Sequence, residues 1–565
     1  MPVPAGESPS RFERWRKATL SPFSYRAFAL FWWASLASSL GSMIQTVGAS
    51  WLMTTIAPSP DMVALVQTAG SAPFFFLSLI SGALADTRDR RIIMLVSQVL
   101  ALAAAAVLAV VTLTTGITPQ LLLWLTFLLG CTMALFAPAW QASIGDQVPR
   151  EEIPPAVMAN SVGFNMARSV GPALGGLIVA AIGAASAFII NAVSYIGIIG
   201  TLVWWRPARE RSELPPEPLG SAMAAGVRYV SLSPHLLAIL LRCLLYTIPI
   251  AAVPALMPIV ARDLLGGGAA TYGILLGGFG VGAMLGALGS APLRERFSSD
   301  ALLRLLSVIA CLAMVAIGLS RWAWLTMLAH VLAGTVWTLA FANFNIAIQL
   351  SSPRWVTGRM LATYQTIAFA GIALGSWWWG EAASVTSLRD ALTLAGVAAL
   401  VSLVAARWLP ISVAEVGSLD PHTVGAANEP SVDIHPTSGP VVITIEYRVK
   451  PENAAEFIAV INELGRIRRR DGARGWTVSQ DIDATDLWVE RFESPTWLDF
   501  LRWRRRPTEA DQAVRARIAQ LIEDRRRVRR LVERPTGAEP LGVSTATRVD
   551  RKPEQERNLQ GGLTS

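Results

Sequence analysis

The feature that most constrains this chain is a regular series of apolar stretches. About twelve runs of roughly 20 residues fill the first 410 positions, separated by short polar connectors. A helix of that length spans the ~30 Å hydrocarbon core of a bilayer. The spacing therefore predicts an all-α polytopic membrane protein whose function is to move something across the membrane.

Lys and Arg are concentrated in alternate connectors between the predicted spans. We place these spans at 27–53, 62–84, 92–114, 119–142, 157–181, 185–205, 236–261, 270–292, 301–320, 323–349, 357–382 and 389–409. One set of connectors carries most of the arginines, whereas the alternating set holds only Arg262, Arg321 and Arg389. The positive-inside rule then predicts an even number of spans, with both termini in the cytoplasm.

The connectors and the composition of the C-terminal region divide the chain into parts. A long polar connector after the sixth span predicts 12 transmembrane helices in two six-helix halves, and alternating apolar positions after residue 440 predict a small cytoplasmic α+β domain of ferredoxin-like order. The predicted parts are a cytoplasmic lead (1–26), the N-terminal half (27–205), a central cytoplasmic loop (206–235), the C-terminal half (236–409), a linker (410–439), the α+β domain (440–535) and a disordered tail (536–565).

Composition excludes several other classes of protein. The 565 residues are 53% hydrophobic and only 16% charged, whereas a soluble protein has about 25% charged residues. The net charge of +8 fits contact with anionic lipid, and no nucleic-acid-binding motif frames the basic clusters. The three cysteines lie far apart in apolar runs, so we expect no disulfide framework, no metal and no cofactor.

The most specific local pattern is GALADTRDRR, residues 82–91, between the second and third spans. It resembles the cytoplasmic loop signature of the major facilitator superfamily at Gly82, Asp86, Arg90 and Arg91, and Arg88 supplies the positive charge that the signature has one position earlier. The resemblance implies a conformational latch. We expect Gly82 to permit close helix packing and the arginines to form contacts that break and re-form. Ordinary topogenic charge is the alternative.

Two further stretches of the N-terminal half bear on the conformational cycle. Asp146, after span four, is a predicted partner of the 88–91 arginines, and a loop carboxylate is the alternative. In span five, the segment with Gly171, Pro172, Gly175 and Gly176 resembles the exporter signature of the superfamily, in which small residues allow close helix approach and proline bends the helix.

Arginines and amides inside the spans are the candidate ligand-binding groups. Arg168 in span five is predicted to bind an anionic substrate, to pair with an acid or to extend to the cytosolic face, whereas Arg242 is predicted to extend to the face. Apolar walls with sparse amides suit amphipathic or aromatic ligands. The candidate cavity amides are Gln45, Gln141, Asn165, Asn191, Asn343, Asn345 and Gln365, of which we expect at least half to form interhelical hydrogen bonds instead.

The C-terminal domain narrows the resemblance. Residues 445–503 resemble the tail of the enterobactin-exporter-like branch, which is similar to the antibiotic-biosynthesis-monooxygenase fold. That resemblance implies a dimerising or regulatory module. Residues 436–565 contain no histidine, so the cofactorless oxygenase chemistry of that fold is not expected here.

These patterns predict a secondary active exporter of the bacterial inner membrane, not an enzyme. By resemblance it is proton-coupled, and it exports siderophore-like or amphipathic, drug-like small molecules by alternating access. One alternative is an importer of an organic anion or sugar, and another is a membrane-anchored enzyme acting through the C-terminal domain.

Overall fold

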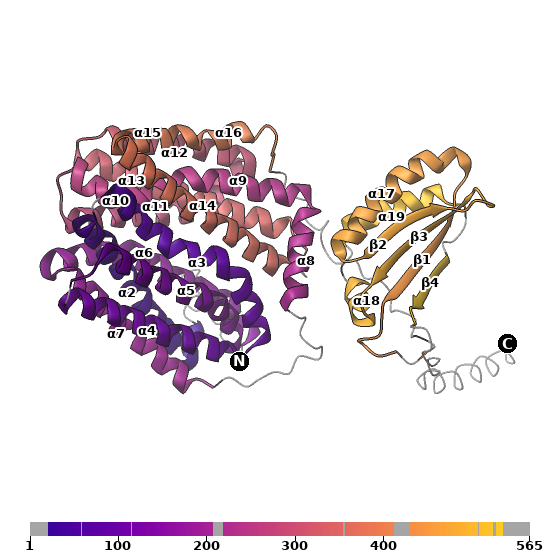
Figure 1. Cartoon of the computed structure of the whole chain (residues 1–565), viewed down its shortest axis with the longest axis horizontal. Helices are drawn as coiled ribbons and strands as arrows, with labels where there is room; N and C mark the ends of the chain where they lie inside the picture. Colours follow the sequence, from indigo (N-terminus) through magenta and orange to yellow (C-terminus); the bar gives the residue numbers. More distant parts are fainter. Residues whose placement is uncertain are drawn as a thin grey trace, which may run out of the picture. The chain divides into compact units, whose positions relative to one another are not determined.

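The computed structural model is dominated by long apolar helices that precede a small sheet domain (Figure 1). It describes residues 21–534 except 58, 115, 207–218, 354–355, 412–429, 431, 433, 505, 507 and 524–526. The predicted disordered tail (536–565), most of the linker and of the N-terminal lead, and part of the central loop lie outside the described residues.

The helices of the N-terminal half match the predicted spans to within a few residues. They are α2 (Arg26–Ile56), α3 (Pro60–Thr87), α4 (Arg90–Thr114), α5 (Pro119–Ser143), α6 (Ile153–Ile182) and α7 (Ala184–Trp204), with short 3-10 turns η1 (Ser21–Ser24), η2 (Ile144–Asp146) and η3 (Arg150–Glu152). The turn between α6 and α7 is a single residue, Gly183, whose φ of 86° is readily adopted only without a side chain.

A further helix, α8 (Leu219–Ser231), lies where the sequence predicts a polar loop. The C-terminal half then comprises α9 (Pro234–Ile250), α10 (Ala252–Ile259), the π-helical turn η4 (Val260–Leu264), α11 (Ala269–Arg296), α12 (Ser299–Leu319), α13 (Ala323–Leu350), α14 (Thr357–Val385), α15 (Leu388–Ala399) and α16 (Val401–Ala405). The break between α9 and α10 lies between Pro249 and Pro254, and Pro254 has no N–H to donate to the Ile250 carbonyl at the break.

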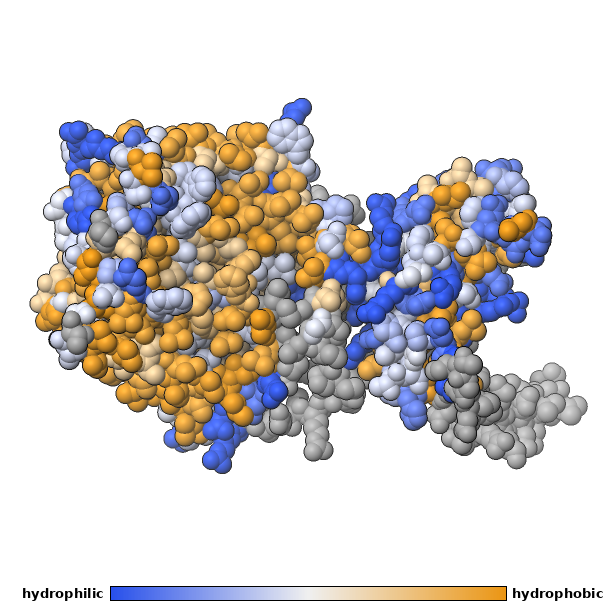
Figure 2. Space-filling model, in the orientation of Figure 1, coloured by the Kyte–Doolittle hydropathy of each residue, from blue (hydrophilic) through white to orange (hydrophobic). Residues whose placement is uncertain are grey.

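The helices carry an apolar exterior suited to lipid. Figure 2 shows apolar side chains over most of the visible face of the helical part, and residues such as Trp124 and Leu288 are 70% and 72% exposed. Among the described residues, ten helical segments are long and apolar enough to cross a membrane. The helices α3 and α14, of 28 and 29 residues, are not among those ten, so the count of twelve spans stays a prediction.

The chain forms two compact units. One holds the residues up to 224, 235–349 and 358–413, and so contains both helical halves. The other holds 225–234, 350–357 and the residues from 414 on. Within the second unit, the Arg470 guanidinium lies 5.0 Å from the ring centroid of Tyr229 in α8.

The sheet domain has the element order β-α-β-β-α-α-β. Its elements are β1 (Val441–Arg448), η5 (Pro451–Asn453), α17 (Ala454–Asp471), β2 (Arg474–Gln480), β3 (Leu487–Ser494), α18 (Trp497–Arg504), α19 (Glu509–Leu521) and β4 (Arg527–Val532). The strands pair antiparallel in the order β2-β3-β1-β4, with Tyr447 opposite Trp488. The sequence predicts the first three strands and the helices but misses β4, because half of RVRRLV is arginine and the segment follows a helical stretch.

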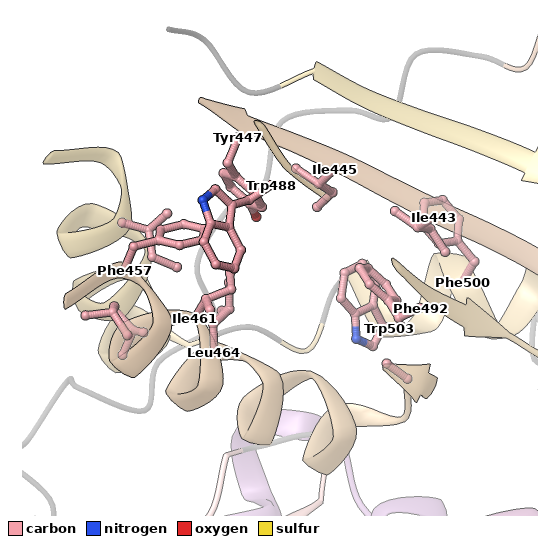
Figure 3. Close-up of a cluster of buried hydrophobic side chains, with 14 of the residues drawn as sticks. Ile443, Ile445, Tyr447, Phe457, Ile461, Leu464, Trp488, Phe492, Phe500 and Trp503 are labelled. Atoms are coloured by element: carbon pink, nitrogen blue, oxygen red, sulfur yellow. The ribbon is translucent and has the colours of Figure 1, made fainter. Parts of the chain in front are cut away.

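The core of this domain lies between one face of the sheet and its helices. Alternate residues of β1, from Val441 to Tyr447, pack with Phe457, Ile461 and Leu464 of α17 and with Trp488 and Phe492 of β3 (Figure 3). The alternation of apolar residues in the sequence, which predicts β1, corresponds to this alternating burial. The domain therefore has a hydrophobic core of its own.

Candidate functional site

The two sides of the helical bundle differ in charge, and this difference orients the description. The connector between α3 and α4 and the end of α11 carry arginines, and we call this the arginine-rich side. The ends of α2 and α6 and the start of α11 lie on the opposite, arginine-poor side. Each functional group can then be placed by its depth between the two sides.

The predicted latch region lies on the arginine-rich side. Arg90 donates to the Asp146 carboxylate at 3.2 Å and to the Ala142 carbonyl at 3.1 Å. Arg91 donates to the carbonyls of Leu202 and Val203 in α7, at 2.7 and 3.0 Å. The Arg90 and Asp146 side chains are 36% and 38% exposed, so the pair contributes only about 0–1 kcal/mol and can separate at little cost.

The structure describes the remaining latch residues, Gly82, Arg88 and Asp86, only in part. Among the described residues, no atom lies within 4 Å of a Cβ placed on Gly82, so the expected close helix packing is not seen there in this conformation. Arg88 follows the end of α3, and its backbone N–H donates to the Leu84 carbonyl. The side chain of Asp86 lies outside what the structure describes.

The glycines of span five are the points at which α6 meets its neighbours. A Cβ on Gly171 would lie 2.7 Å from the Met43 side chain, and one on Gly175 would lie 3.0 Å from the Ile44 Cα, both in α2. A Cβ on Gly176 would lie 2.7 Å from the Cα of Gly273 in α11, which belongs to the other half. The segment therefore packs α6 against both halves at van der Waals distance.

Pro172 contributes to the same contact without interrupting the assigned helix. Since proline has no N–H, the carbonyl of Arg168, four residues earlier, receives no helical hydrogen bond from it. The backbone of α11 comes close to this carbonyl, because a Cβ on Gly280 would lie 2.6 Å from the Arg168 oxygen. The Ser169 hydroxyl also donates to the Gly280 carbonyl at 3.1 Å. The α6–α11 contact thus extends from the arginine-poor side to the middle of the bundle.

A second contact between the halves joins α3 and α14. The Thr68 hydroxyl donates to the Ala373 carbonyl at 3.1 Å, and the rings of Phe74 and Phe369 stack with centroids 4.3 Å apart. On the arginine-poor side, Arg262 also donates to the Thr54 carbonyl at the end of α2. Sequence reasoning missed this seam, since serine, threonine and phenylalanine within a span do not indicate which helix they face.

Three of the predicted cavity amides are instead held between helices. Asn191 donates to the Gln45 side chain at 2.6 Å and lies 3.2 Å from the Tyr195 hydroxyl. Asn343 donates to the Ser299 carbonyl at 3.0 Å. All three amides are buried, which corrects their assignment to a substrate cavity. A buried amide needs a partner, and a neighbouring helix is the nearest source of one.

The other four amides keep more exposure. Asn165 is half-buried and donates to the Ser161 carbonyl of its own helix at 2.9 Å. Asn345 accepts from Gln349 at 2.5 Å, Gln365 is half-buried and Gln141 is exposed. Asn165 lies one turn from Ser169, on the stripe of α6 that meets α11, and its role as a ligand-binding amide stays a prediction.

Arg242 is a charged residue within a helix of the C-terminal half, and the sequence analysis predicts its environment incorrectly. The prediction that it extends to the membrane face is wrong, since its side chain is fully buried and forms an ion pair with Asp300 at the start of α12. It also donates to the Leu409 carbonyl at 3.3 Å, and Arg304 pairs with Asp300 at 2.5 Å. The available sequence signal for a buried charge partner was Asp300, which lies four residues before Arg304 at the start of α12.

The C-terminal domain contains a buried ion pair. The Glu490 carboxylate is fully buried and accepts from Arg468 Nε at 2.5 Å, from the Tyr447 hydroxyl at 2.8 Å and from Trp476 Nε1 at 2.8 Å. Arg468 also lies 4.6 Å from the Phe492 ring centroid. These donors occupy the carboxylate on several sides, which is typical of a structural ion pair rather than of a catalytic base awaiting a substrate.

A second acidic group in this domain carries a pH prediction. Burial raises the pKa of Asp471 from 3.8 to about 6, and the nearby Arg470 opposes that rise. Since the folded pKa exceeds the unfolded one, the associated stability is present below pH ~4 and is lost as the pH rises through ~6. We expect Asp471→Asn to remove about 2–3 kcal/mol of this pH dependence.

Hydrogen exchange of the β1 amides in the full chain, corrected for intrinsic rates, measures the effect at pH 4.5 and 7. The wild type should be more protected at the lower pH, and the variant should show a smaller difference. Asp483→Asn is the matched control, because Asp483 is solvent-exposed in the turn between β2 and β3. An unchanged difference in Asp471→Asn would contradict the assignment.

Comparison with known proteins supports the fold and decides the family. The model of the transmembrane secretion effector family matches residues 17–536. The chain belongs to this family of the major facilitator superfamily. It is therefore a multi-pass membrane transporter.

Two relatives of this transporter are about a quarter identical to it over the residues that align. It is 25% identical over 394 residues to the multidrug efflux pump Tap of Mycolicibacterium fortuitum, covering 67% of this chain and 95% of the relative. It is 28% identical over 166 residues to the staphyloferrin A transporter of Staphylococcus aureus, covering 29% of this chain and 42% of the relative.

Solved structures show the same fold at low sequence identity. A bacterial homologue of the human lysosomal transporter Spinster, in an inward-facing and unoccupied conformation, aligns with a TM-score of 0.54 and 15% identity over 69% of this chain and 98% of that one. A POT family transporter in complex with a thioalcohol-conjugated peptide aligns with a TM-score of 0.57 and 11% identity over 68% of this chain and 97% of that one.

Proposed function

We propose that this transporter is an exporter of amphipathic small molecules, siderophore-like or drug-like, that works by alternating access in a bacterial inner membrane. The observation that carries the proposal is the α6–α11 contact, in which the exporter-like segment of α6 packs directly on the other half at Gly176. Relatives that are named as a multidrug efflux pump and a siderophore transporter support the direction and the substrate class.

The proposal includes an orientation and a state. Both termini lie in the cytoplasm on this proposal, because the arginine-rich connectors mark the cytoplasmic side. The contacts of Gly176 with Gly273, of Arg262 with Thr54 and of Gly380 with Asp61 lie on the other side. We therefore infer an inward-facing state in which the periplasmic side is closed.

Proton coupling is part of the proposal, although the chain offers few carriers. His330 in α13 is fully buried and its Nδ1 contacts the Thr326 carbonyl at 2.8 Å, whereas Glu381 near the end of α14 is exposed. Dimerisation or regulation through the C-terminal domain completes the proposal, because that domain has its own core.

Substrate flux in proteoliposomes with an imposed pH gradient tests the proposal. Export into inside-out vesicles should require the gradient and should include a siderophore or a drug from a broad panel. Transport in the opposite direction would support the alternative, an importer of an organic anion. The positive charge of Arg168 within α6 is the observation that favours this alternative. Absence of gradient-dependent flux for every compound of the panel would overturn the hypothesis that the protein is an exporter.

The Arg90–Asp146 pair gives a prediction for the conformational latch. Asp146→Asn removes the charge partner of Arg90, and we expect it to reduce transport several-fold without changing membrane insertion. Glu151→Gln, a nearby carboxylate of η3, is the matched control and should transport normally. Flux in vesicles, normalised to the amount of inserted protein, distinguishes the two, and normal flux in Asp146→Asn would remove the latch role.

A further inference from the structure

Helix α8 has one buried face within the compact unit that contains the C-terminal domain. Ala225, Tyr229 and Val230 are buried and follow helical spacing, whereas Val227 on the other face is 56% exposed. The residues of α8 from 225 on belong to the same unit as the C-terminal domain. The helix is therefore amphipathic, and its buried face packs on protein.

Tyr229 lies over a cation that the C-terminal domain holds in a fixed position. The Arg470 guanidinium carbon lies 5.0 Å from the Tyr229 ring centroid. Both oxygens of Asp511, in the capping box of α19, accept from Arg470 Nη2 at 3.0 Å, and Asp471 accepts from its Nε at 3.1 Å. The two carboxylates orient the guanidinium within its own domain, and its flat face contacts the ring.

A second side chain of α8 reaches the C-terminal end of α17. A Cβ on Gly472, where α17 ends, would lie 3.2 Å from Arg228 Nη2 and 2.9 Å from Arg506 Nη1. Arg506 also donates to the Asp471 carbonyl. The C-terminus of a helix carries partial negative charge and favours nearby cations. Two consecutive residues of α8, Arg228 and Tyr229, therefore meet the same end of α17.

The chain connects this contact to the helices of the C-terminal half. Helix α9 begins at Pro234, directly after the turn that ends α8, and the same compact unit includes 350–357, which joins α13 to α14. Helices α9 and α14 pack closely, because a Cβ on Gly375 would lie 2.9 Å from the Ile248 carbonyl carbon, and Trp379 donates to the Ile248 oxygen at 3.0 Å. The second unit thus holds one end of both helices, and α14 forms the seam with α3.

We propose that the C-terminal domain is an intramolecular clamp, docked on α8 through Arg228 and Tyr229, that stabilises the state in which the arginine-poor side is closed. The docking contact occurs in the same structure as the α6–α11 and α3–α14 contacts. A state that opens the arginine-poor side moves α14 relative to α3, and with it the connectors that the domain holds, so part of the docking is lost there. The inference rests on the proposed alternating access and names a regulation of it.

Cleavage of the linker in the full-length protein tests the docking. A protease site is inserted between residues 420 and 421, the helical part is immobilised through an N-terminal tag, and the C-terminal fragment that stays bound after cleavage is measured. The wild type should retain the fragment, whereas Tyr229→Ala, which removes the ring over Arg470, should lower retention about five-fold or more. Val227→Ala, on the exposed face of α8, is the matched control. Equal retention in the two variants would overturn the docking.

Two further comparisons separate undocking from unfolding. The fragment released from Tyr229→Ala should resist trypsin as the wild-type fragment does, because Tyr229 lies outside the hydrophobic core of the domain. Tyr229→Phe keeps the ring and should retain more of the fragment than Tyr229→Ala. Equal loss in these two variants would mean that the contact between Arg470 and the ring does not dock the domain.

Cysteine labelling of the uncleaved chain tests the effect on the transport cycle. Trp51→Cys places a thiol near the end of α2, on the arginine-poor side. An impermeant maleimide should label this thiol several-fold faster in the Tyr229→Ala background than in the Val227→Ala background. Equal labelling rates would overturn the clamp. Neither experiment needs a substrate, so a failure of export would contradict the proposed function while faster labelling would still support the clamp.

Discussion

Gly273→Ala should prevent the arginine-poor side of the bundle from closing and should lower transport at least several-fold. A Cβ at this position would lie 2.6 Å from the Cα of Gly176 and 2.7 Å from the Pro172 carbonyl oxygen. These are backbone atoms of α6, which no rotamer change can move. The helices would have to separate, at the cost of about 1–3 kcal/mol that is typical of overpacking.

That cost applies to one state of the transport cycle. The α6–α11 contact joins the two halves on the arginine-poor side, so a state that opens this side separates the two glycines and accommodates the methyl group. A bias of about 1–3 kcal/mol changes the ratio of the two states by about 5- to 150-fold. Since every cycle must pass through both states, we expect the variant to remain folded and to transport slowly.

The measurement combines flux with labelling of a cysteine on the arginine-poor side. Trp51→Cys replaces a ring that stacks on Tyr272 at 6.5 Å, close to the contact. An impermeant maleimide should label it faster in the Gly273→Ala background. Gly277→Ala is the matched control one turn along α11, where the new Cβ would lie 3.3 Å from the Ala173 side chain and is tolerated by a small shift. Wild-type flux and labelling in Gly273→Ala would show that this contact does not close the gate.

The sequence predicts the helices well because the bilayer imposes a simple requirement. Each span must be about 20 apolar residues, and α2 to α7 begin and end within a few residues of the predicted limits. It also predicts β1, where buried and less buried residues alternate, and α17, where the apolar residues follow helical spacing. Strand β4 was missed because it lies at the edge of the sheet and its charged residues do not alternate with apolar ones.

The sequence predicts the depth of a polar residue in the bundle but not its partner. Gln45 and Asn191 are 146 positions apart, and nothing in either span shows that α2 and α7 bring them to 2.6 Å. In the sequence, Arg168 and Arg242 are both single charges within apolar runs. In the structure, Arg168 lies over the Phe279 ring, whereas Arg242 pairs with Asp300. Such differences depend on helix rotation and tertiary packing, which hydropathy does not encode.

Arg468→Ala should unfold the C-terminal domain or leave it marginally stable. The substitution removes both hydrogen bonds that Arg468 makes to Glu490, at 2.5 and 3.0 Å, and leaves a fully buried carboxylate without its counter-charge. Breaking a buried pair in this way costs about 3–5 kcal/mol. That cost is a large part of the 5–15 kcal/mol that stabilises a typical domain.

Removing both charges separates the cost of an unpaired charge from the value of the pair. In Arg468→Met with Glu490→Gln, the amide oxygen can still accept from Trp476 Nε1, the amide NH2 group can donate to the Tyr447 hydroxyl oxygen, and neither residue of the pair carries a charge. We expect this double variant to be more stable than Arg468→Ala. Arg517→Ala, which breaks the exposed pair with Glu463 at 3.0 Å, is the control and should change stability by less than about 1 kcal/mol.

Limited proteolysis of the full chain in detergent, followed at the β1–α17 segment, ranks these variants. The expected order of resistance is Arg517→Ala first, the double variant next and Arg468→Ala last. Transport assayed in the same preparations then shows whether the domain is required, because Arg468→Ala perturbs the domain core and leaves the helical residues unchanged. Equal resistance of Arg468→Ala and Arg517→Ala would mean that the Arg468–Glu490 pair does not stabilise the domain.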